Sequence, residues 1–148
     1  MTDYSLIKKE LQALLNKDDP PISSLSNSSA LLKEMIEDIN WVGFYQLNND
    51  YLELGPFQGK VACVRLPLSR GVCARAVRKN STIVVDNVEV FDGHIACDTS
   101  SKSEIVIPLR KGNEIFGVLD IDSPKIARFS ELDKIGLELI AHVIEDIL

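Results

Sequence analysis

Long apolar runs are missing from this chain of 148 residues. No stretch approaches the roughly 20 apolar residues that a bilayer-spanning helix needs. Residues 1–15 mix charged with apolar side chains, so they lack the apolar core of a signal peptide. We therefore predict no membrane span and no secretory leader, and we expect the protein to be cytoplasmic.

A surplus of basic residues is missing as well. The chain has 16 Lys and Arg against 22 Asp and Glu, a net charge of -6 at pH 7. Because nucleic-acid affinity comes largely from clustered Lys and Arg, this balance argues against a nucleic-acid partner. The 45% hydrophobic and 26% charged residues, without repeats or low-complexity segments, are typical of a globular protein. The length suits a single domain over residues 1–148.

Cysteine is scarce, and the odd count of three prevents complete pairing. In a reducing cytosol, cysteines serve more often as thiols, metal ligands or redox catalysts than as a disulfide framework. Nine residues separate Cys63 from Cys73, and two separate His94 from Cys97. This spacing does not match the two short clips of a structural zinc site. We predict no metal and no cofactor.

Apolar residues at three-and-four spacing predict a helix at each end of the chain and another near the first. Asp3 can cap the first helix, and Ser130 with Asp133 resembles a capping arrangement for the last. Ser69 is expected to cap a short helix that runs through Val77. The three long helices are predicted over residues 3–16, 20–39 and 130–147.

Six strands are predicted where short apolar or alternating runs lie between turn-forming residues. Turns at residues 48–50 and 111–113 join two pairs of them as hairpins. Helices at both ends of hairpin-joined strands predict an α+β fold, an antiparallel sheet with helices on one face and the other face open for a pocket. The strands are expected at residues 41–47, 51–54, 63–66, 82–85, 105–107 and 115–119.

The polar loop that carries Cys97 is the first candidate for chemistry. A thiol of ordinary pKa is mostly protonated at neutral pH, so a nucleophile needs a cationic, dipolar or hydrogen-bonding environment. His94 and Lys102 lie near Cys97 in the sequence. Cys73 lies in the first turns of the short helix, where amide dipoles favour a thiolate. The alternative for each of these cysteines, and for Cys63, is that of a small hydrophobic residue in the core.

Acidic side chains form the second candidate. Asp120 and Asp122 alternate with apolar residues, so an extended strand directs both carboxylates to one face, where they suit a pocket for an amino group. The alternative is a strand end that runs into a turn, where Asp is common. Glu104 points away from its apolar neighbours and can enter the same pocket. Near other carboxylates its pKa rises and it can act as an acid, whereas otherwise it is an exposed loop residue.

Two aromatic residues complete the candidate site. Trp41 and Tyr45 lie on one face of the first strand, with Gly43 between them. This pattern can form an aromatic wall that the backbone approaches closely at the glycine. The alternative is ordinary core packing.

Six segments, in order over nearly the whole chain, match one known family. The matching segments are residues 40–45, 54–59, 71–73, 93–98, 101–106 and 117–122. Through them the chain resembles the free methionine-(R)-sulfoxide reductases, which are single-domain GAF proteins. The resemblance implies a GAF fold with a central antiparallel six-stranded sheet, terminal helices on one face, and a pocket on the other that encloses the free amino acid.

The resemblance implies roles for the candidate residues. Cys97 is the catalytic cysteine, Cys63 the recycling cysteine, and Cys73 a further recycling thiol. The Cys97 thiolate would attack the sulfoxide sulfur while Glu104 protonates the departing oxygen. The resulting sulfenic acid would condense with Cys63, whose Cα must then lie within about 7 Å of that of Cys97. The residues implied around the substrate are Trp41, Tyr45, Glu104, Asp120 and Asp122.

Partners follow from the same resemblance and from the helices. The family suggests thioredoxin as the reductant of the disulfide and a role under oxidative stress. Exposed apolar residues on the terminal helices suit a symmetric homodimer. Two other functions remain open from the sequence: a ligand-binding sensor module, since a fold alone does not establish function, and a redox switch without substrate turnover.

Overall fold

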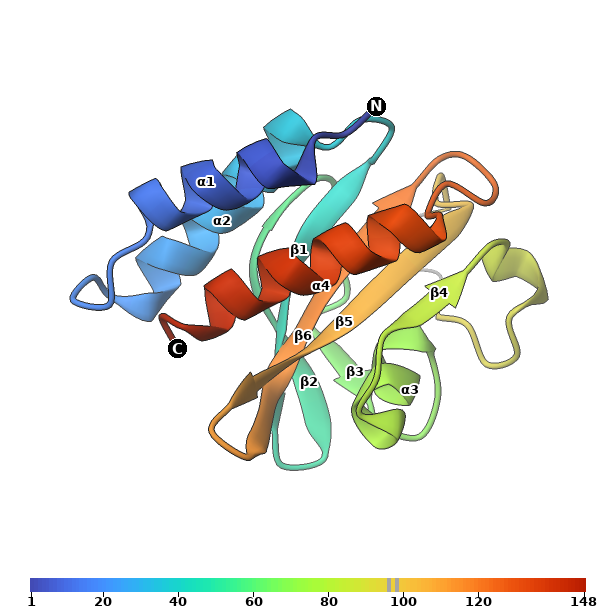
Figure 1. Cartoon of the computed structure of the whole chain (residues 1–148). Helices are drawn as coiled ribbons and strands as arrows, with labels where there is room; N and C mark the ends of the chain where they lie inside the picture. Colours follow the sequence, from blue (N-terminus) through green and yellow to red (C-terminus); the bar gives the residue numbers. More distant parts are fainter. Residues whose placement is uncertain (96, 98) are drawn as a thin grey trace.

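The structure is a computed structural model that describes residues 1–95, 97 and 99–148 (Figure 1). Ala96 and Asp98, which belong to the matched segment 93–98, lie outside the described residues. No described helix is both long and apolar enough to cross a bilayer. The elements are α1 (Tyr4–Leu14), α2 (Pro21–Met35), β1 (Trp41–Asn48), β2 (Tyr51–Gln58), β3 (Arg65–Pro67), α3 (Val72–Lys79), β4 (Ile83–Val85), the 3-10 helix Val88–Val90, β5 (Ser103–Lys111), β6 (Glu114–Ser123) and α4 (Glu131–Glu145).

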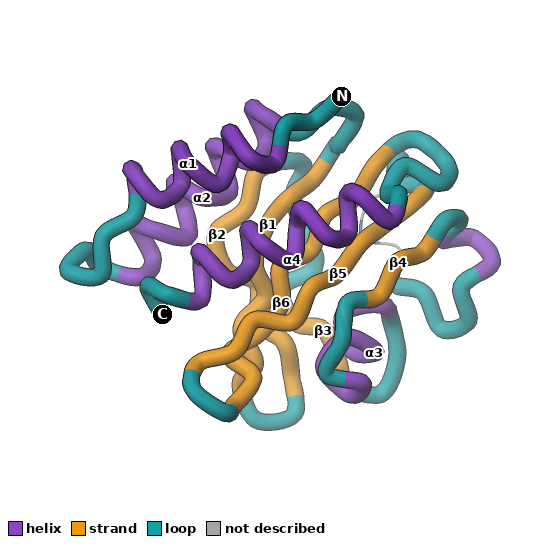
Figure 2. The backbone as a smooth tube through the Cα atoms, in the orientation of Figure 1, coloured by secondary structure: helices purple, strands orange, loops and turns teal. Residues whose placement is uncertain are grey.

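A six-stranded antiparallel sheet organises the fold, in the order β3-β2-β1-β6-β5-β4. The β1–β2 and β5–β6 hairpins lie side by side because β1 pairs with β6. Helices α1, α2 and α4 cover one face of the sheet, whereas α3 packs on the other face, mainly against β5 and β6 (Figures 1 and 2). The predicted α+β class and six-stranded antiparallel sheet are confirmed.

The sheet separates two hydrophobic cores. Successive side chains of a strand point to opposite faces. On β1, Val42 and Phe44 therefore enter the core beneath α1, α2 and α4, while Trp41 and Tyr45 enter the core beneath α3. Strands β5 and β6 contribute buried side chains to both cores, which explains why they read as nearly continuous apolar runs.

Local capping fixes the starts of α1 and α4 as predicted. The Asp3 side chain accepts a hydrogen bond from the backbone N–H three residues on, at 3.0 Å. Ser130 and Asp133 form a reciprocal capping box at the start of α4. The Tyr4 hydroxyl donates to Asp133 at 2.7 Å, so the first turn of α1 is joined to the first turn of α4.

Helix α2 is shorter than predicted. It ends at Met35, and Ile36 already has an extended backbone. Asp38 follows with a φ of 58°, a conformation that no helix continues through. The helical apolar period extends to Ile39 only because Ile36 and Ile39 both reach the same core after the chain has left the helix.

Two predicted starts near the cysteines are wrong. Ser69 does not cap the short helix, which follows Gly71, whose φ of 97° is a conformation that suits glycine. The third strand begins at Arg65, where pairing with β2 begins, so Cys63 lies in the preceding loop. In both places the backbone follows tertiary pairing and packing, which local residue preferences do not encode.

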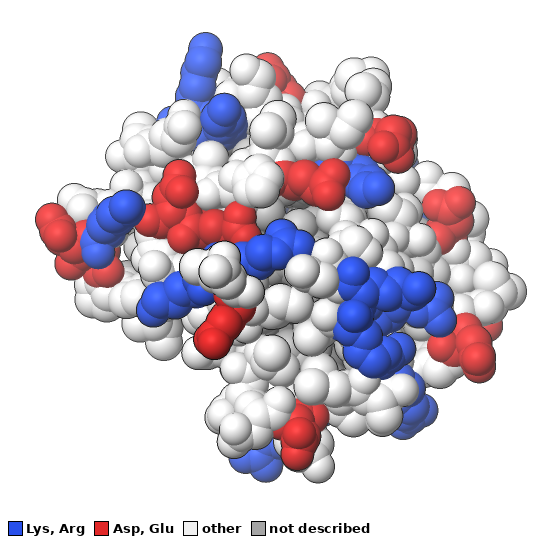
Figure 3. Space-filling view, turned by 60° about the horizontal axis from the view of Figure 1, so that its bottom comes forward, with Lys and Arg blue, Asp and Glu red and all other residues white. Residues whose placement is uncertain are grey.

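Charge is mixed over the lower face of the molecule. Figure 3 turns this face, with the hairpin tips and α3, toward the reader. Some Lys and Arg gather there in one local patch, and the others lie scattered among Asp and Glu across the rest of the face. This arrangement is not the continuous basic surface on which nucleic-acid binding depends.

Candidate active site

A pocket lies on the sheet face that carries α3. Its lining comes from β1, β3, β5, β6, α3 and the loops before β3, α3 and β5. The structure brings together all the predicted site residues here except Cys63, which does not line the pocket but is bonded to a residue that does. Those that line it are Trp41, Tyr45, Cys73, Cys97, Glu104, Asp120 and Asp122.

A disulfide closes one side of the pocket. Cys63 and Cys97 are bonded, with their Cα atoms 5.7 Å apart, and they lie 34 positions apart in the chain. The bond links the loop before β3 to the loop before β5, within the Cα separation expected of a disulfide. All three cysteines are described, and Cys73 is the one that remains free.

The aromatic wall holds the loop that carries Cys63. Trp41 stacks between Tyr45 and Phe57, at centroid distances of 6.0 and 5.2 Å. The Trp41 indole N–H donates to the carbonyl of Lys60 at 3.1 Å, and the Tyr45 hydroxyl donates to the carbonyl of Cys63 at 3.0 Å. The two pocket aromatics therefore anchor the backbone of this loop as well as line the pocket.

Gly43 lets the strands approach closely behind this wall. A Cβ atom at this position would lie 2.3 Å from Cβ of Phe57 and 2.7 Å from the Trp41 ring. No rotation of a neighbouring side chain removes the first of these contacts, because Cβ is fixed to the backbone. Glycine is thus required for the stacking of Trp41 on Phe57, in agreement with the close backbone approach that the sequence predicts here.

Three carboxyl groups share the floor of the pocket. Glu104 on β5 pairs in register with Asp122 on β6, and Asp120 lies two positions away on the same face. Glu104 and Asp120 are each only 6% exposed. Burial raises the pKa of Glu104 well above its ordinary value, and the charges of Asp120 and Asp122 raise it further. Glu104 therefore retains its proton more readily than a free glutamate and is equipped to donate it.

The pKa of Asp120 is subject to opposing influences. Burial raises the pKa of Asp120, but hydrogen bonds from Glu104 and Cys73 oppose that rise by stabilising the carboxylate. Glu104 and Asp120 thus interact directly, and the pKa of each is raised by burial.

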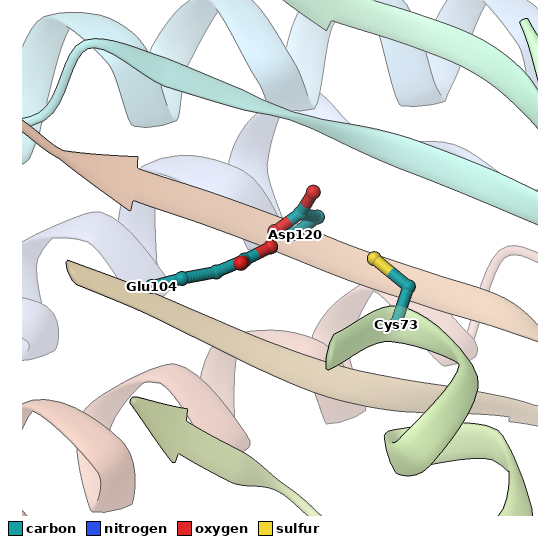
Figure 4. Close-up of side chains that lie close together, drawn as sticks. All are labelled: Cys73, Glu104 and Asp120. Atoms are coloured by element: carbon teal, nitrogen blue, oxygen red, sulfur yellow. The ribbon is translucent and has the colours of Figure 1, made fainter. Parts of the chain in front are cut away.

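Cys73 points from the first turn of α3 toward Asp120 (Figure 4). It is buried, and burial, reinforced by the negative charges of Asp120 and Glu104, raises the pKa of its thiol. These surroundings favour the packed thiol over the thiolate that amide dipoles alone would produce.

The basic residues near Cys97 in sequence separate in space. His94 lines the pocket, with Nε2 3.8 Å from Oε1 of Glu104, and burial lowers its pKa. The Lys102 ammonium instead pairs with Glu89, at 3.6 Å. His94 therefore lies beside the carboxyl groups of the pocket floor, whereas Lys102 does not.

Some pocket residues were not assigned by sequence reasoning. Arg70 and Ser101 also line the pocket. The Asn40 side chain donates to the hydroxyls of Ser100 and Ser101, at 3.3 and 3.1 Å, and so joins the start of β1 to the loop before β5. Asn40 and Ser101 stand first in two of the segments matched above, which was the available signal. Arg70 lies in none of them, and only its tertiary position reveals it.

Comparison with known proteins identifies the family. A family model described as a GAF domain matches residues 28–148. The free methionine-R-sulfoxide reductase (fRMsr) of Escherichia coli strain K12 is 50% identical over 145 residues, which cover 98% of this chain and 88% of that protein.

Solved structures agree as well. The fRMsr of Staphylococcus aureus in its reduced form has a TM-score of 0.96 and 51% identity, covering 100% of this chain and 96% of that one. The free methionine-R-sulfoxide reductase of Neisseria meningitidis in complex with its substrate has a TM-score of 0.92 and 39% identity, covering 97% of this chain and 87% of that one. The chain therefore belongs to the free methionine-R-sulfoxide reductase family of GAF-domain proteins.

Proposed function

We propose that the protein reduces free methionine-(R)-sulfoxide to methionine, with Cys97 as the nucleophile, Cys63 as the resolving thiol and a thioredoxin as the reductant. The observation that carries the proposal is the Cys63–Cys97 disulfide, placed beside a pocket with an aromatic wall and an acidic floor. It supports a cycle in which the product of the chemical step is stored as a disulfide.

The pocket suits a free amino acid with an apolar side chain. Asp120 and Asp122 lie where they can receive the ammonium group, a charge that a residue within a polypeptide lacks. Trp41 and Tyr45 provide an apolar wall for the methylene and methyl groups of the substrate. We infer that the acidic floor selects the free amino acid over protein-bound methionine sulfoxide.

The chemical step transfers the sulfoxide oxygen to Cys97. The thiolate attacks the substrate sulfur while Glu104 protonates the oxygen, whose bond to that sulfur then breaks. The bond between Cys97 Sγ and the substrate sulfur then breaks, and its electron pair stays on the methionine sulfur while the oxygen passes as a hydroxyl group to Cys97. Cys97 is thereby oxidised to a sulfenic acid as the sulfoxide is reduced to methionine.

The recycling step restores the thiol. The Cys63 thiol attacks the sulfur of the sulfenic acid, and the disulfide forms. The displaced hydroxide takes up the thiol proton and leaves as water. A thioredoxin-type dithiol then reduces the disulfide by exchange and is itself oxidised. Cys73 is buried and lines the same pocket as Cys97, and it serves at most as a further recycling thiol. A cycle of this kind belongs in a reducing compartment such as the cytoplasm and suits a role under oxidative stress.

Incubation of the reduced protein with the separated epimers of methionine sulfoxide, thioredoxin and its reductase tests the proposal. We expect repeated turnover of the R epimer alone. Cys97→Ser should form no methionine, whereas Cys63→Ser should form about one per chain before Cys97 stalls oxidised, unless Cys73 substitutes. Multiple turnover by Cys97→Ser would refute the assigned nucleophile. Formation of the disulfide with peroxide, without any response to methionine sulfoxide, would indicate a redox switch instead.

A further inference from the structure

Three potential metal ligands from separate elements converge in the floor of the pocket. The Sγ atom of Cys73 and one carboxylate oxygen each of Glu104 and Asp120 lie within 4.8 Å of one another. Figure 4 shows the side chains directed toward a common region from α3, β5 and β6. All three residues are buried, so the group is a feature of the interior rather than an exposed acidic cluster.

An orphaned oxygen marks the same point. Oδ1 of Asp120 is buried and has no hydrogen-bond partner among the described residues. No Lys or Arg within the described part of the chain forms an ion pair with Glu104 or Asp120. A buried carboxylate oxygen without a partner is costly, so the site gains stability from a bound cation.

The mixture of donors indicates the kind of cation. An ammonium group is recognised by oxygen acceptors, and a sulfur atom adds little to such a site. Calcium and magnesium require about six oxygen ligands, which three buried donors do not supply. One sulfur and two oxygens instead match a borderline-soft ion such as Zn²⁺, which takes thiolate and carboxylate ligands in a tetrahedral arrangement.

We propose that Cys73, Glu104 and Asp120 form a site for a divalent ion of the zinc type, and that this ion competes with the substrate for the acidic floor of the pocket. The ion is an inhibitory ligand and not a cofactor, since it occupies carboxyl groups that the reaction uses. The competition rests on the proposed function, whereas the binding of the ion does not.

The geometry requires only a small adjustment. With Zn–S of about 2.3 Å and Zn–O of about 2.0–2.2 Å, tetrahedral ligands lie about 3.3–3.7 Å apart. Donor atoms that lie within 4.8 Å of one another must therefore approach by about 1.5 Å at most. Coordination removes the proton of a thiol. The fourth position faces the pocket, where His94 lies close to Glu104 or a water can bind. The short ligand spacing that a structural zinc site shows in the sequence does not apply to Cys73, Glu104 and Asp120, because these residues come from three separate elements.

The oxidised protein offers a direct test, because its disulfide leaves Cys73 as the one free thiol. Titration with Co²⁺ should produce a thiolate-to-cobalt absorption band that saturates at one ion per chain and disappears when Zn²⁺ is added. Cys73→Ser should abolish the band, and Asp120→Asn should weaken binding about tenfold or more. The control His142→Ala removes the exposed His142–Glu145 pair on α4 and should change nothing. Absence of the band, or its persistence in Cys73→Ser, would overturn the proposed site.

Competition is measured on the same oxidised protein. Free methionine-(R)-sulfoxide should raise the apparent Kd for Co²⁺ more than an equal concentration of alanine, which chelates metal through the same amino and carboxylate groups but has no side chain to fill the pocket. Equal effects of the two amino acids would overturn the competition. Cobalt binding without sulfoxide turnover would leave the metal site standing and refute the proposed function. Sulfoxide turnover without cobalt binding would leave the proposed function standing and refute the metal site.

Discussion

Glu104 ties the chemistry of the pocket to the pH dependence of folding. Burial and its acidic neighbours raise the pKa of Glu104 in the folded chain, whereas in the unfolded chain it ionises near its ordinary value of about 4.3. At pH values between these two pKa values, Glu104 is therefore protonated in the folded chain and ionised in the unfolded chain. The contribution of this group to stability is present at low pH and is lost as pH rises through its folded pKa.

We predict that Glu104→Gln weakens this pH dependence, because glutamine preserves the shape of the side chain and does not ionise. Urea unfolding of the oxidised protein from about pH 5 to about pH 8 should show a smaller loss of stability for the variant than for the parent chain. Turnover should fall about 10²–10⁴-fold, since the acid is lost. Glu114→Gln, on the exposed end of β6, is the matched control. An identical pH slope in parent and Glu104→Gln would contradict the protonation assigned to Glu104.

Strand β1 carries two aromatic residues that both line the pocket and hold the loop that carries Cys63. Its Tyr45 hydroxyl holds the carbonyl of Cys63, and its Trp41 indole holds that of Lys60. We predict that Tyr45→Phe, which preserves the ring, slows disulfide formation by up to about tenfold, because one hydrogen bond contributes about 1 kcal/mol. The lifetime of the Cys97 sulfenic acid, measured with a trapping reagent after rapid mixing, should lengthen accordingly.

Tyr51→Phe is the matched control for that experiment, because Tyr51 is exposed at the start of β2. It should leave the sulfenic acid lifetime unchanged. A Tyr45→Phe variant that resolves as quickly as the parent would show that the hydroxyl does not position Cys63.

Elements defined by local chemistry were predictable from the sequence, and those defined by packing were not. The capping box at Ser130 is encoded within four residues. The common face of Asp120 and Asp122 follows from the two-residue period of a strand. By contrast, the start of β3 depends on its pairing with β2, and the convergence of Cys73 on Asp120 depends on where α3 docks against the sheet. Neither dependence is visible in local sequence.

At the scale of the whole molecule, α4 exposes an apolar face. Leu132, Ile135 and Leu139 are 72%, 49% and 48% exposed, and their three-and-four spacing directs them along one side of the helix. We propose that this face pairs with its counterpart in a second copy to form a homodimer with twofold symmetry.

We predict that Ile135→Glu shifts the protein toward monomers, because it would bury a charge in the interface. Sedimentation velocity at several concentrations measures the change. The control is Val90→Glu, since Val90 is 80% exposed on the 3-10 helix and distant from α4 in the chain. A parent protein that stays monomeric throughout would contradict the dimer, and so would an Ile135→Glu variant that dimerises as the parent does.

The bond between Cys63 and Cys97 also makes the chain a ring over part of its length. The ring encloses β3, α3, β4 and the 3-10 helix, and its two ends lie 34 positions apart in the chain. Cross-linking a segment of this length removes freedom from the unfolded chain and is worth about 4 kcal/mol of folding stability in the chain-entropy description. Each catalytic cycle would thus alternate between a reinforced and a relaxed form of the same fold. The protein would resist unfolding and proteolysis best while it waits for reductant, when oxidants are most abundant.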